Sequence, residues 1–397
     1  MAEIVRRLRP AVVSAYPITP QTHIVEDLAK MKAEGGADFE YINAESEFAA
    51  ASIVLGASAT GVRTYTATSS QGLLLMTEVL FNIAGLRLPV VITCANRAVS
   101  SPINIWNDQQ DSVTIRDAGW VQLYGETNQE VVDLHILAYK LAESLMLPVM
   151  VNMDGFGLTH TYEPVEIPDE SLIKKYLPDY KSAKDMILDV NNPRSLGTFA
   201  TPDRYMEIRQ ELFSDVALAK KEIVKLNSEF EKVFGHSLGD NGLVEQYKTK
   251  DAEIILVAMG SVCGTIKEVV NKLRIKGKKV GLLKIISFRP FPDEEVCAIL
   301  SKAKYIGVID KSISIGTEGI LASDLKRACY DKVKAQIKSF VVGLGGRDVT
   351  EKMIHDIVEL AKGKNNRTKF IGFFAPDIFG GFINIIVGHN LIIFKYS

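Results

Sequence analysis

The chain has 397 residues, of which 47% are hydrophobic and 24% are charged, and its formal net charge is −2. A chain of this length can fold into roughly two or three domains with sizeable cores, and its composition is that of an ordinary globular protein. Because nucleic-acid binding relies on clustered Lys and Arg, the near-neutral charge and the lack of a basic stripe argue against a nucleic-acid partner.

The cysteines are few and stand far apart in the sequence, at Cys94, Cys263, Cys297 and Cys329. None of them forms a Cys-x-x-Cys pair, so we expect no metal site, neither a zinc site nor an iron–sulfur cluster, in this chain. Such cysteine usage is typical of a reducing, cytoplasmic setting. The first eight residues contain Arg and lack the apolar core of a signal peptide, so we expect no export.

Residues 1–160 alternate apolar runs with helical segments, which predicts one doubly wound α/β domain. Strands are expected at residues 11–15, 39–43, 62–67, 88–94 and 147–153, and helices at residues 2–9, 27–33, 45–59, 73–84 and 126–145.

Residues 161–250 break this alternation with several prolines and then a long charged helix at 203–234, so we interpret them as an irregular connector. Residues 251–365 resume the alternation and predict a smaller doubly wound domain. Its strands are expected at 253–258, 280–286, 305–310 and 338–343, and its helices at 264–273, 293–303, 317–330 and 350–362.

Residues 366–397 form an atypical apolar tail, in which Asp377 is the only charge between Phe370 and Phe394. The tail approaches the length of a membrane span, but Pro376, Gly380 and Gly381 interrupt it, which argues against a membrane segment. A subunit contact and an altered reading frame are the other interpretations, and the sequence does not decide among them.

Polar groups follow the first two expected strands. Pro17 and Pro20 hold Thr19 in a stiff loop after the first strand, because proline fixes φ and favours an extended predecessor. Glu45 and Glu47 follow the second strand. In open parallel sheets ligands bind at the carboxyl ends of the strands, although a strand followed by a proline loop is too common to identify a ligand.

The next two strand ends carry further candidates. The turn at residues 68–72 opens a helix, and its N–H groups can hold a polar ligand or simply be capped by Ser and Thr. Arg97 follows a continuous apolar strand and can clamp a carboxylate or neutralise Asp108 or Asp111. The loop at residues 102–111 is dense in Asn, Asp and Gln, which favours substrate contacts there.

A family resemblance is carried by five stretches, which occur in the same order as in the family: YPITPQT at 16–22, ESE at 45–47, TATSSQGL at 66–73, NIWNDQQD at 104–111 and VGLGGRDVT at 342–350. Together they resemble the alpha subunit of pyruvate:ferredoxin oxidoreductases over residues 5–370. The motifs are highly specific for 2-oxoacid:ferredoxin oxidoreductases as a group and less so for the substrate.

The resemblance implies a thiamine-diphosphate pyrimidine-binding-type doubly wound domain, followed by a transketolase C-terminal-like α/β domain. It implies oxidative decarboxylation of pyruvate to acetyl-CoA, with coenzyme A as cosubstrate and with electrons passed to ferredoxin. The family's Gly-Asp-Gly diphosphate motif is missing, since Gly239-Asp240-Asn241 stands in a linker-like region instead. We therefore expect magnesium and iron–sulfur clusters in beta-, gamma- and delta-type partner subunits, which would share the thiamine diphosphate.

The same resemblance assigns roles to three residues. Glu47 is expected to be the catalytic, cofactor-binding carboxylate that hydrogen-bonds a ring nitrogen of the cofactor, a role that calls for partial burial. Glu45 is the neighbour to exclude, because on a helix the two side chains would point about 200° apart. Thr19 is expected to donate its hydroxyl to the substrate, and Arg97 to clamp the substrate carboxylate.

Pyruvate is preferred because the loop at residues 105–108 resembles pyruvate enzymes more than branched-chain ones. The equivalent subunit for 2-oxoisovalerate or another 2-oxoacid is the close alternative, while oxalate enzymes should carry a cation at the place of Thr19. A non-catalytic structural subunit is disfavoured by the presence of Glu47, Thr19 and Arg97. Family members usually begin with an extra segment before the position of Met1, which leaves open a shortened first helix.

Overall fold

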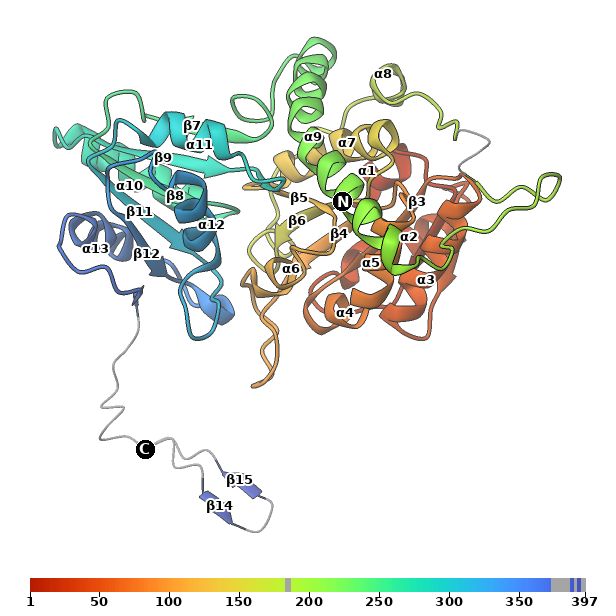
Figure 1. The fold of residues 1–397 in the computed structure, drawn as a ribbon, viewed down its shortest axis with the longest axis horizontal. Helices are drawn as coiled ribbons and strands as arrows, with labels where there is room; N and C mark the ends of the chain where they lie inside the picture. Colours follow the sequence, from red (N-terminus) through yellow and green to blue (C-terminus); the bar gives the residue numbers. More distant parts are fainter. Residues whose placement is uncertain (183–186, 373–385, 389–390, 394–397) are drawn as a thin grey trace.

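The computed structural model describes residues 1–182, 187–372, 386–388 and 391–393, and two mainly parallel sheets form its frame (Figure 1). The first sheet has the strand order β10-β5-β6-β4-β3-β1-β2 and is parallel except for β10, which runs antiparallel to β5. Its strands are β1 (Val12–Ala15), β2 (Glu40–Asn43), β3 (Thr64–Thr68), β4 (Val91–Asn96), β5 (Val121–Tyr124), β6 (Val149–Asp154) and β10 (Ser287–Arg289).

Helices cover both faces of the first sheet, which explains why its central strands are buried along their whole length. One face packs against α1 (Ala2–Arg7), α2 (Thr22–Ala33) and α7 (Asn128–Leu145). The other face packs against α3 (Glu47–Ala59), α4 (Ser70–Leu75) and α5 (Thr77–Gly85), and a short helix, α6 (Gln110–Thr114), precedes β5.

The second sheet has the order β13-β12-β11-β8-β9-β7, with only β7 antiparallel to its neighbour among the described strands. Its strands are β7 (Val244–Tyr247), β8 (Ile254–Ala258), β9 (Val280–Ile285), β11 (Tyr305–Asp310), β12 (Ile337–Val341) and β13 (Lys369–Phe370). One face packs against α10 (Val262–Ile275) and α13 (Glu351–Ala361), and the other against α11 (Asp293–Leu300) and α12 (Ile320–Cys329). A short 3₁₀ turn, η1 (Leu344–Gly346), follows β12.

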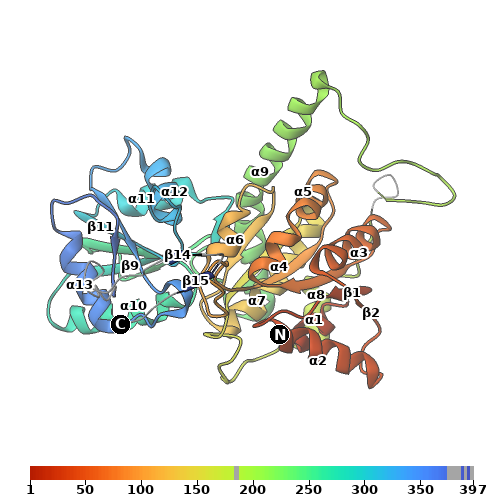
Figure 2. The same ribbon diagram turned by 90° about the horizontal axis from the view of Figure 1, so that it is seen from below.

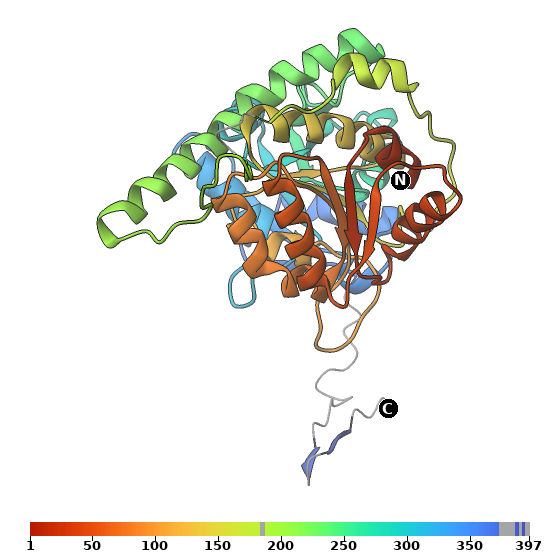
Figure 3. The same cartoon turned by 90° about the vertical axis from the view of Figure 1, so that its right-hand side faces the viewer.

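Between the sheets, the chain forms α8 (Glu170–Tyr176) and the long helix α9 (Pro202–Phe234). Proline in the first turn and Gly235 at the end, with a φ of 83°, set the limits of α9. Leu212, Ala219, Ile223 and Phe230 recur at helical spacing and are buried against the first domain. The amino-terminal turns of α9 are exposed and project from the body of the protein (Figures 2 and 3).

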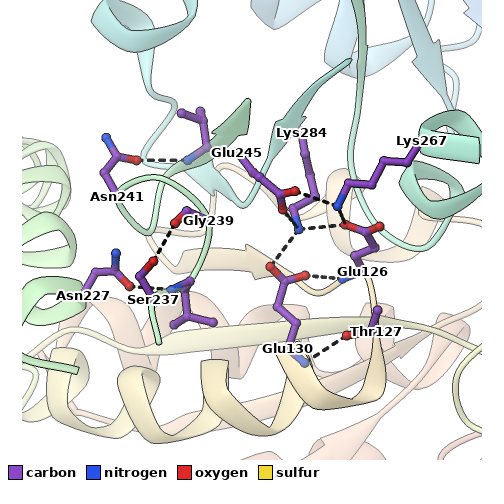
Figure 4. A network of polar contacts seen from close by, with 12 residues as sticks. Glu126, Thr127, Glu130, Asn227, Ser237, Gly239, Asn241, Glu245, Lys267 and Lys284 are labelled. Carbon is purple, nitrogen blue, oxygen red and sulfur yellow. Dashed lines mark hydrogen bonds and ion pairs between the residues drawn. The ribbon is translucent and has the colours of Figure 1, made fainter. Parts of the chain in front are cut away.

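The two domains are joined by strand pairing, apolar packing and a buried ionic cluster. β10 lies in the second half of the sequence but extends the first sheet, and one apolar core continues from the first sheet through Phe288 into the second domain. Lys284 of β9 is 3% exposed and lies 2.8 Å from Glu126 and 2.9 Å from Glu130 of the first domain (Figure 4). Glu245 and Lys267 complete this cluster.

Most expected elements occur within a few residues of their expected bounds. The expected elements do not include β5, β7, β10, β13 or the short helices α6 and α8, and the helix expected at 73–84 is divided into α4 and α5 at Met76. The domain boundaries expected at residues 160, 250 and 365 stay predictions.

The apolar tail lies mostly outside the described residues. Its described parts are residues 366–372, which include β13 on the edge of the second sheet, and the short antiparallel strands β14 (Ile386–Gly388) and β15 (Leu391–Ile393). Among the described helices, none is long and apolar enough to cross a membrane.

Candidate active site

The candidate residues meet at one edge of the first sheet. β1, β2, β3 and β4 are parallel, so the loops that follow them carry Thr19, Glu47, Gly72 and Arg97 to the same side. The strand order reverses direction at β1, whose neighbours are β2 and β3. Such a switch point separates the loops of adjacent strands and is where doubly wound sheets bind ligands.

Glu47 is the first residue of α3, and Ser46 caps this helix by accepting a hydrogen bond of 3.1 Å from the backbone N–H of Ala49. The Glu47 side chain is buried at 7% exposure, whereas Glu45 is exposed. The Glu47 carboxylate forms no hydrogen bond or ion pair with the described residues. A buried carboxylate without a protein partner is costly, and this points to a ligand that supplies one.

Gly72 forms the wall opposite Glu47. A Cβ atom at position 72 would lie 2.7 Å from Glu47 Oε1 and 2.5 Å from Thr68 Oγ1, so only glycine fits there. The hydroxyls of Thr68 and Ser69 are buried and have no hydrogen-bond partner in the described protein. Ser69 occupies the N-cap position of α4, but its side chain makes no capping hydrogen bond. The capping interpretation of this turn is therefore wrong for Ser69.

These groups form a polar cradle defined by Glu47, Thr68, Ser69 and Gly72. It combines one carboxylate with two unpaired hydroxyls and has no room for a side chain at position 72. A flat heterocycle that carries both a ring nitrogen and an amino group would satisfy such a set of donors and acceptors. The donor and acceptor types of this set match those that an aminopyrimidine ring requires.

Arg97 lies beside the Thr19 loop. Its Nη1 donates to the Thr19 carbonyl at 2.9 Å, and its Nε donates to the Asn104 carbonyl at 3.0 Å. The side chain is buried, and burial lowers the pKa of its guanidinium, against an opposing effect of Asp111. The guanidinium forms no ion pair with Asp108 or Asp111 within the described residues, which leaves its Nη2 group available to a carboxylate.

Thr19 is exposed in the loop that follows the carboxyl end of β1, and its backbone carbonyl is bound by Arg97. Gln21 stabilises the loop from within, because its Nε2 donates to the Tyr16 carbonyl at 2.8 Å and its backbone N–H donates to the Ile18 carbonyl. The Thr19 hydroxyl has no hydrogen bond to the described protein. Thr19 and Arg97, expected separately from the sequence, thus lie in direct contact.

Asp111 connects the cradle to Arg97, a role that was not expected from the sequence. Its Oδ2 accepts hydrogen bonds of 2.9 Å from the backbone N–H groups of Ser70 and Arg97, and its Oδ1 accepts from Asn96 at 2.9 Å. It is fully buried, and burial raises its pKa against these hydrogen bonds. The only signal in the sequence is its place in the polar loop, which does not separate it from Asp108.

The sequence Gly239-Asp240-Asn241 lies elsewhere, in the turn that enters β7 near the ionic cluster (Figure 4). Asp240 Oδ2 accepts hydrogen bonds from both nitrogens of Gln246, and Asn241 Oδ1 accepts from the Leu243 backbone N–H at 3.1 Å. These residues stabilise a turn and lie away from the cradle, which agrees with their linker-like setting in the sequence.

Two family models match the chain. One, described as pyruvate flavodoxin/ferredoxin oxidoreductase, thiamine diphosphate-binding, covers residues 3–228, and another, described as pyruvate:ferredoxin oxidoreductase core domain II, covers residues 252–354.

Curated relatives resemble the chain over most of its length. Pyruvate synthase subunit PorA of Methanosarcina barkeri is 50% identical over 89% of this chain and 88% of its own. Ketoisovalerate oxidoreductase subunit VorA of Pyrococcus horikoshii is 44% identical over 88% of this chain and 89% of its own.

Solved structures share the fold at low sequence identity. A 2-oxoglutarate:ferredoxin oxidoreductase from Magnetococcus marinus matches with a TM-score of 0.67 and 19% identity, over 90% of this chain and 63% of that longer chain. An inactive tetramer of a split-gene transketolase matches with a TM-score of 0.52 and 12% identity, over 91% of this chain and 96% of that chain. The expected fold, a thiamine-diphosphate pyrimidine-binding-type domain followed by a transketolase C-terminal-like domain, is confirmed.

Proposed function

Because the chain belongs to the pyruvate:ferredoxin oxidoreductase family, we propose that it is the alpha subunit of a thiamine-diphosphate-dependent enzyme that oxidises pyruvate. In this reaction pyruvate, coenzyme A and two oxidised ferredoxins give acetyl-CoA, carbon dioxide, a proton and two reduced ferredoxins. The observation that carries the proposal is the buried, unpaired Glu47 carboxylate facing the Gly72 wall at the switch point of the sheet.

Glu47 is the residue that would act on the cofactor. Thiamine diphosphate, when bound, supplies the electron sink that permits decarboxylation of a 2-oxoacid. A carboxylate at the ring nitrogen holds the proton that favours the imino form of the aminopyrimidine, and low exposure strengthens this hydrogen bond. Thr68 and Ser69 would satisfy the remaining polar atoms of the ring and fix its orientation.

Arg97 and Thr19 would bind the substrate. Arg97 offers Nη2, while its Nε and Nη1 groups are fixed by the carbonyls of Asn104 and Thr19. A guanidinium fixed in this way can hold a carboxylate at low entropic cost. The Thr19 carbonyl is in direct contact with Arg97, and in this proposal the Thr19 hydroxyl donates to the keto oxygen of the same substrate.

A partner subunit is proposed to complete the site. Tyr16, Ile42 and Phe48 lie within a few residues of Thr19 or Glu47 in the sequence, and each is about 40% exposed. Exposed apolar side chains around a buried polar cradle favour coverage by another protein. In this proposal a beta-type subunit supplies the diphosphate and magnesium site, and gamma- and delta-type subunits carry iron–sulfur clusters to ferredoxin. The cytoplasmic location stays a prediction.

The second candidate is the equivalent subunit for 2-oxoisovalerate, which the ketoisovalerate oxidoreductase relative favours. Both candidates keep Glu47, Thr19 and Arg97 in the same roles. They differ in the space that the assembled site leaves for the substrate's alkyl group.

The test is ferredoxin or viologen reduction by the complex that copurifies with this chain, with coenzyme A and a panel of 2-oxoacids. The panel contains pyruvate, 2-oxoisovalerate, 2-oxoglutarate, phenylglyoxylate and oxalate. We expect the highest kcat/KM with pyruvate. A preference for 2-oxoisovalerate would select the second candidate, and no activity with any acid would contradict a catalytic role.

A further inference from the structure

A loop of the second domain, residues 343–347, lies against the polar loop at residues 102–109 of the first domain. The Asn104 side chain donates to the Gly345 carbonyl at 3.1 Å, and the Gly345 backbone N–H donates to Asp108 Oδ2 at 3.1 Å. The Gly346 backbone N–H donates to the Asn107 carbonyl at 2.6 Å. Two motifs that the function so far leaves without a role are thus joined by three hydrogen bonds.

The two loops approach so closely that they require glycine at the contact. Gly345 has a φ of +61°, and a Cβ atom there would lie 2.6 Å from Asn104 Nδ2. Gly346 has a φ of +80°, and a Cβ atom there would overlap the Trp106 side chain. Both the backbone conformation and the space therefore exclude larger residues. The contact is specified by the sequence of both domains.

The same polar loop holds the proposed substrate clamp. The Asn104 carbonyl accepts the hydrogen bond from Arg97 Nε at 3.0 Å, and the Ala98 backbone N–H donates to the Trp106 carbonyl at 3.0 Å. Asn104 therefore binds Gly345 through its side chain and Arg97 through its backbone. A shift of the second-domain loop would displace the carbonyl on which the Arg97 guanidinium rests.

The polar loop is also anchored on its other side. Lys311 of the second domain donates from Nζ to the Asn107 side chain, and its carbonyl accepts from the Gln109 backbone N–H at 2.8 Å. Asn107 and Asp108 are both 5% exposed. The loop that supports Arg97 is therefore held over much of its length by groups of the second domain.

We infer that the second-domain loop 343–347 positions Arg97 through Asn104, and so sets the affinity of the site for the substrate carboxylate. This inference rests on the proposed function, because it takes Arg97 as the carboxylate clamp. Asn104 and Gly345 are positioning residues and touch no reacting atom. The second domain, which lies outside the cradle, thus acts on substrate binding by holding one side of the first domain's substrate loop.

The test compares Asn104→Ala and Gly345→Ala with Gly316→Ala in the complete complex. Asn104→Ala removes the side-chain donor and keeps the carbonyl that Arg97 uses. Gly345→Ala places a methyl group against Asn104, whereas Gly316 has a similar positive φ of +87° and open space around it. We expect the KM for the 2-oxoacid to rise about tenfold in the first two variants, or about 1.4 kcal/mol. Their kcat should change less than about twofold, and Gly316→Ala should leave KM unchanged.

A double-mutant cycle with Arg97→Lys separates positioning from general structural damage. If Asn104 acts through Arg97, Asn104→Ala should add little to the KM of the Arg97→Lys enzyme. Independent, multiplying effects would overturn the inference, as would an unchanged KM in Asn104→Ala. Should Gly345→Ala fail to assemble, the Asn104 cycle still decides the matter.

The assay uses whichever 2-oxoacid the unaltered complex turns over fastest. A substrate other than pyruvate would therefore contradict the pyruvate assignment, and the positioning role would be decided by the same KM measurements on that acid. An active unaltered complex with unchanged variants would contradict the positioning role alone. An unaltered complex that is inactive with every 2-oxoacid would overturn both.

Discussion

Glu47 and Glu45 are separated by one residue and differ completely in environment. Glu47 begins α3 and is buried beneath Gly72, whereas Glu45 precedes the N-cap Ser46 and is exposed. The N-cap residue turns the chain between them, so the two carboxylates are not interchangeable. This difference makes Glu45 the natural control for Glu47.

Glu47→Gln is expected to leave assembly intact and to lower kcat/KM by roughly 10²–10³-fold, or about 3–4 kcal/mol, because an amide cannot stabilise the protonated ring nitrogen. The measurement is steady-state pyruvate-dependent viologen reduction by the purified complex. Glu45→Gln removes the same charge from an exposed site and should retain normal turnover. Near-normal turnover of Glu47→Gln would remove Glu47 from the active site.

His135 of α7 is fully buried in the first domain. Its Nδ1 lies 2.6 Å from the Val131 carbonyl and must donate to it, so its Nε2 accepts from the Thr93 hydroxyl, also at 2.6 Å. Burial lowers the pKa of His135 from 6.5 to about 4, against the hydrogen bond to Val131. Protonation of Nε2 in the folded protein would place a positive charge on a fully buried ring.

The unfolded chain therefore binds more protons than the folded chain between the two pKa values of His135. The contribution of His135 to the free energy of unfolding is therefore expected to have its full value above about pH 6.5. It should fall by up to roughly 3 kcal/mol as the pH drops to about 4. Urea unfolding midpoints across this range check the prediction. A His135→Gln variant, although less stable at neutral pH, should lose this part of the pH dependence, and an unchanged pH dependence would exclude His135 as its source.

For single residues, the sequence indicated which side chains are candidates for the site better than it indicated which side chains they contact. Glu47, Thr19 and Arg97 were named from the family motifs, and their roles stay predictions. The contact of Arg97 with Thr19 joins residues far apart in the sequence, and no local pattern indicates it. Asp111 was missed for the same reason, because its hydrogen bonds to Ser70 and Arg97 exist only once two strands are adjacent.

At the scale of elements, two glycines of the first domain have opposite surroundings. Gly72 of α4 packs against Glu47 and Thr68, whereas Gly56 of α3 has open space where a Cβ atom would lie. Gly72 and Gly56 therefore have different effects on the structure. One glycine allows the helix to approach the cradle, and the other only adds freedom to the unfolded chain.

Gly72→Ala is expected to lower kcat/KM by about 10–100-fold, because the added methyl group must displace the Glu47 carboxylate, an overpacking worth roughly 1–3 kcal/mol. Gly56→Ala should keep activity and stabilise α3 by about 0.5–1 kcal/mol. Paired measurements of activity and thermal unfolding distinguish the two. Equal activity of both variants would show that the Gly72 wall does not constrain Glu47.

The elements that the sequence predicted are those with a strong local pattern. β4 and β8 are continuous apolar runs, and α9 is long, charged and closed by Gly235. β10 has three residues and contains Arg289, and it is a strand because it pairs with β5. No Gly or Pro marks the break between α4 and α5 at Met76, so periodicity alone predicted one helix there.

At the scale of the whole molecule, the buried ionic cluster joins the two domains through polar contacts, as the shared apolar core joins them through apolar packing. The Lys284 side chain is only 3% exposed. Its ammonium group faces Glu126 and Glu130 of the first domain and Glu245 of the second. Burial alone would lower the pKa of Lys284, but Glu130, Glu126 and Glu245 raise it above its usual value. Lys284 is therefore charged at neutral pH and holds the three carboxylates together.

Lys284→Met is expected to reduce the free energy of unfolding by about 3–5 kcal/mol, because it leaves buried carboxylates without their main partner. Lys272→Met is the matched control, since Lys272 pairs with Glu351 in a half-exposed bridge of 2.7 Å, and it should not change the unfolding midpoint measurably. Denaturant unfolding followed by circular dichroism provides the comparison. Equal midpoints for the two variants would mean that the cluster does not hold the domains together.

The presence of two α/β domains could be predicted from the alternation of strands and helices, and their family from the motifs. How the domains join could not, because β10, Lys284 and the 343–347 loop act across long sequence separations. Their short segments carry no local pattern that indicates a partner in the other half of the chain.

The position of β10 limits how the chain can be divided or synthesised. A fragment that ends before Ser287 would contain every parallel strand of the first sheet but would expose β5 as an unpaired edge. Open edge strands recruit other chains and aggregate. On the ribosome, the first sheet must therefore await β7, β8, α10 and β9 of the second domain before its last strand can pair. Expression of the two halves from separate genes is expected to need a chaperone for the first half.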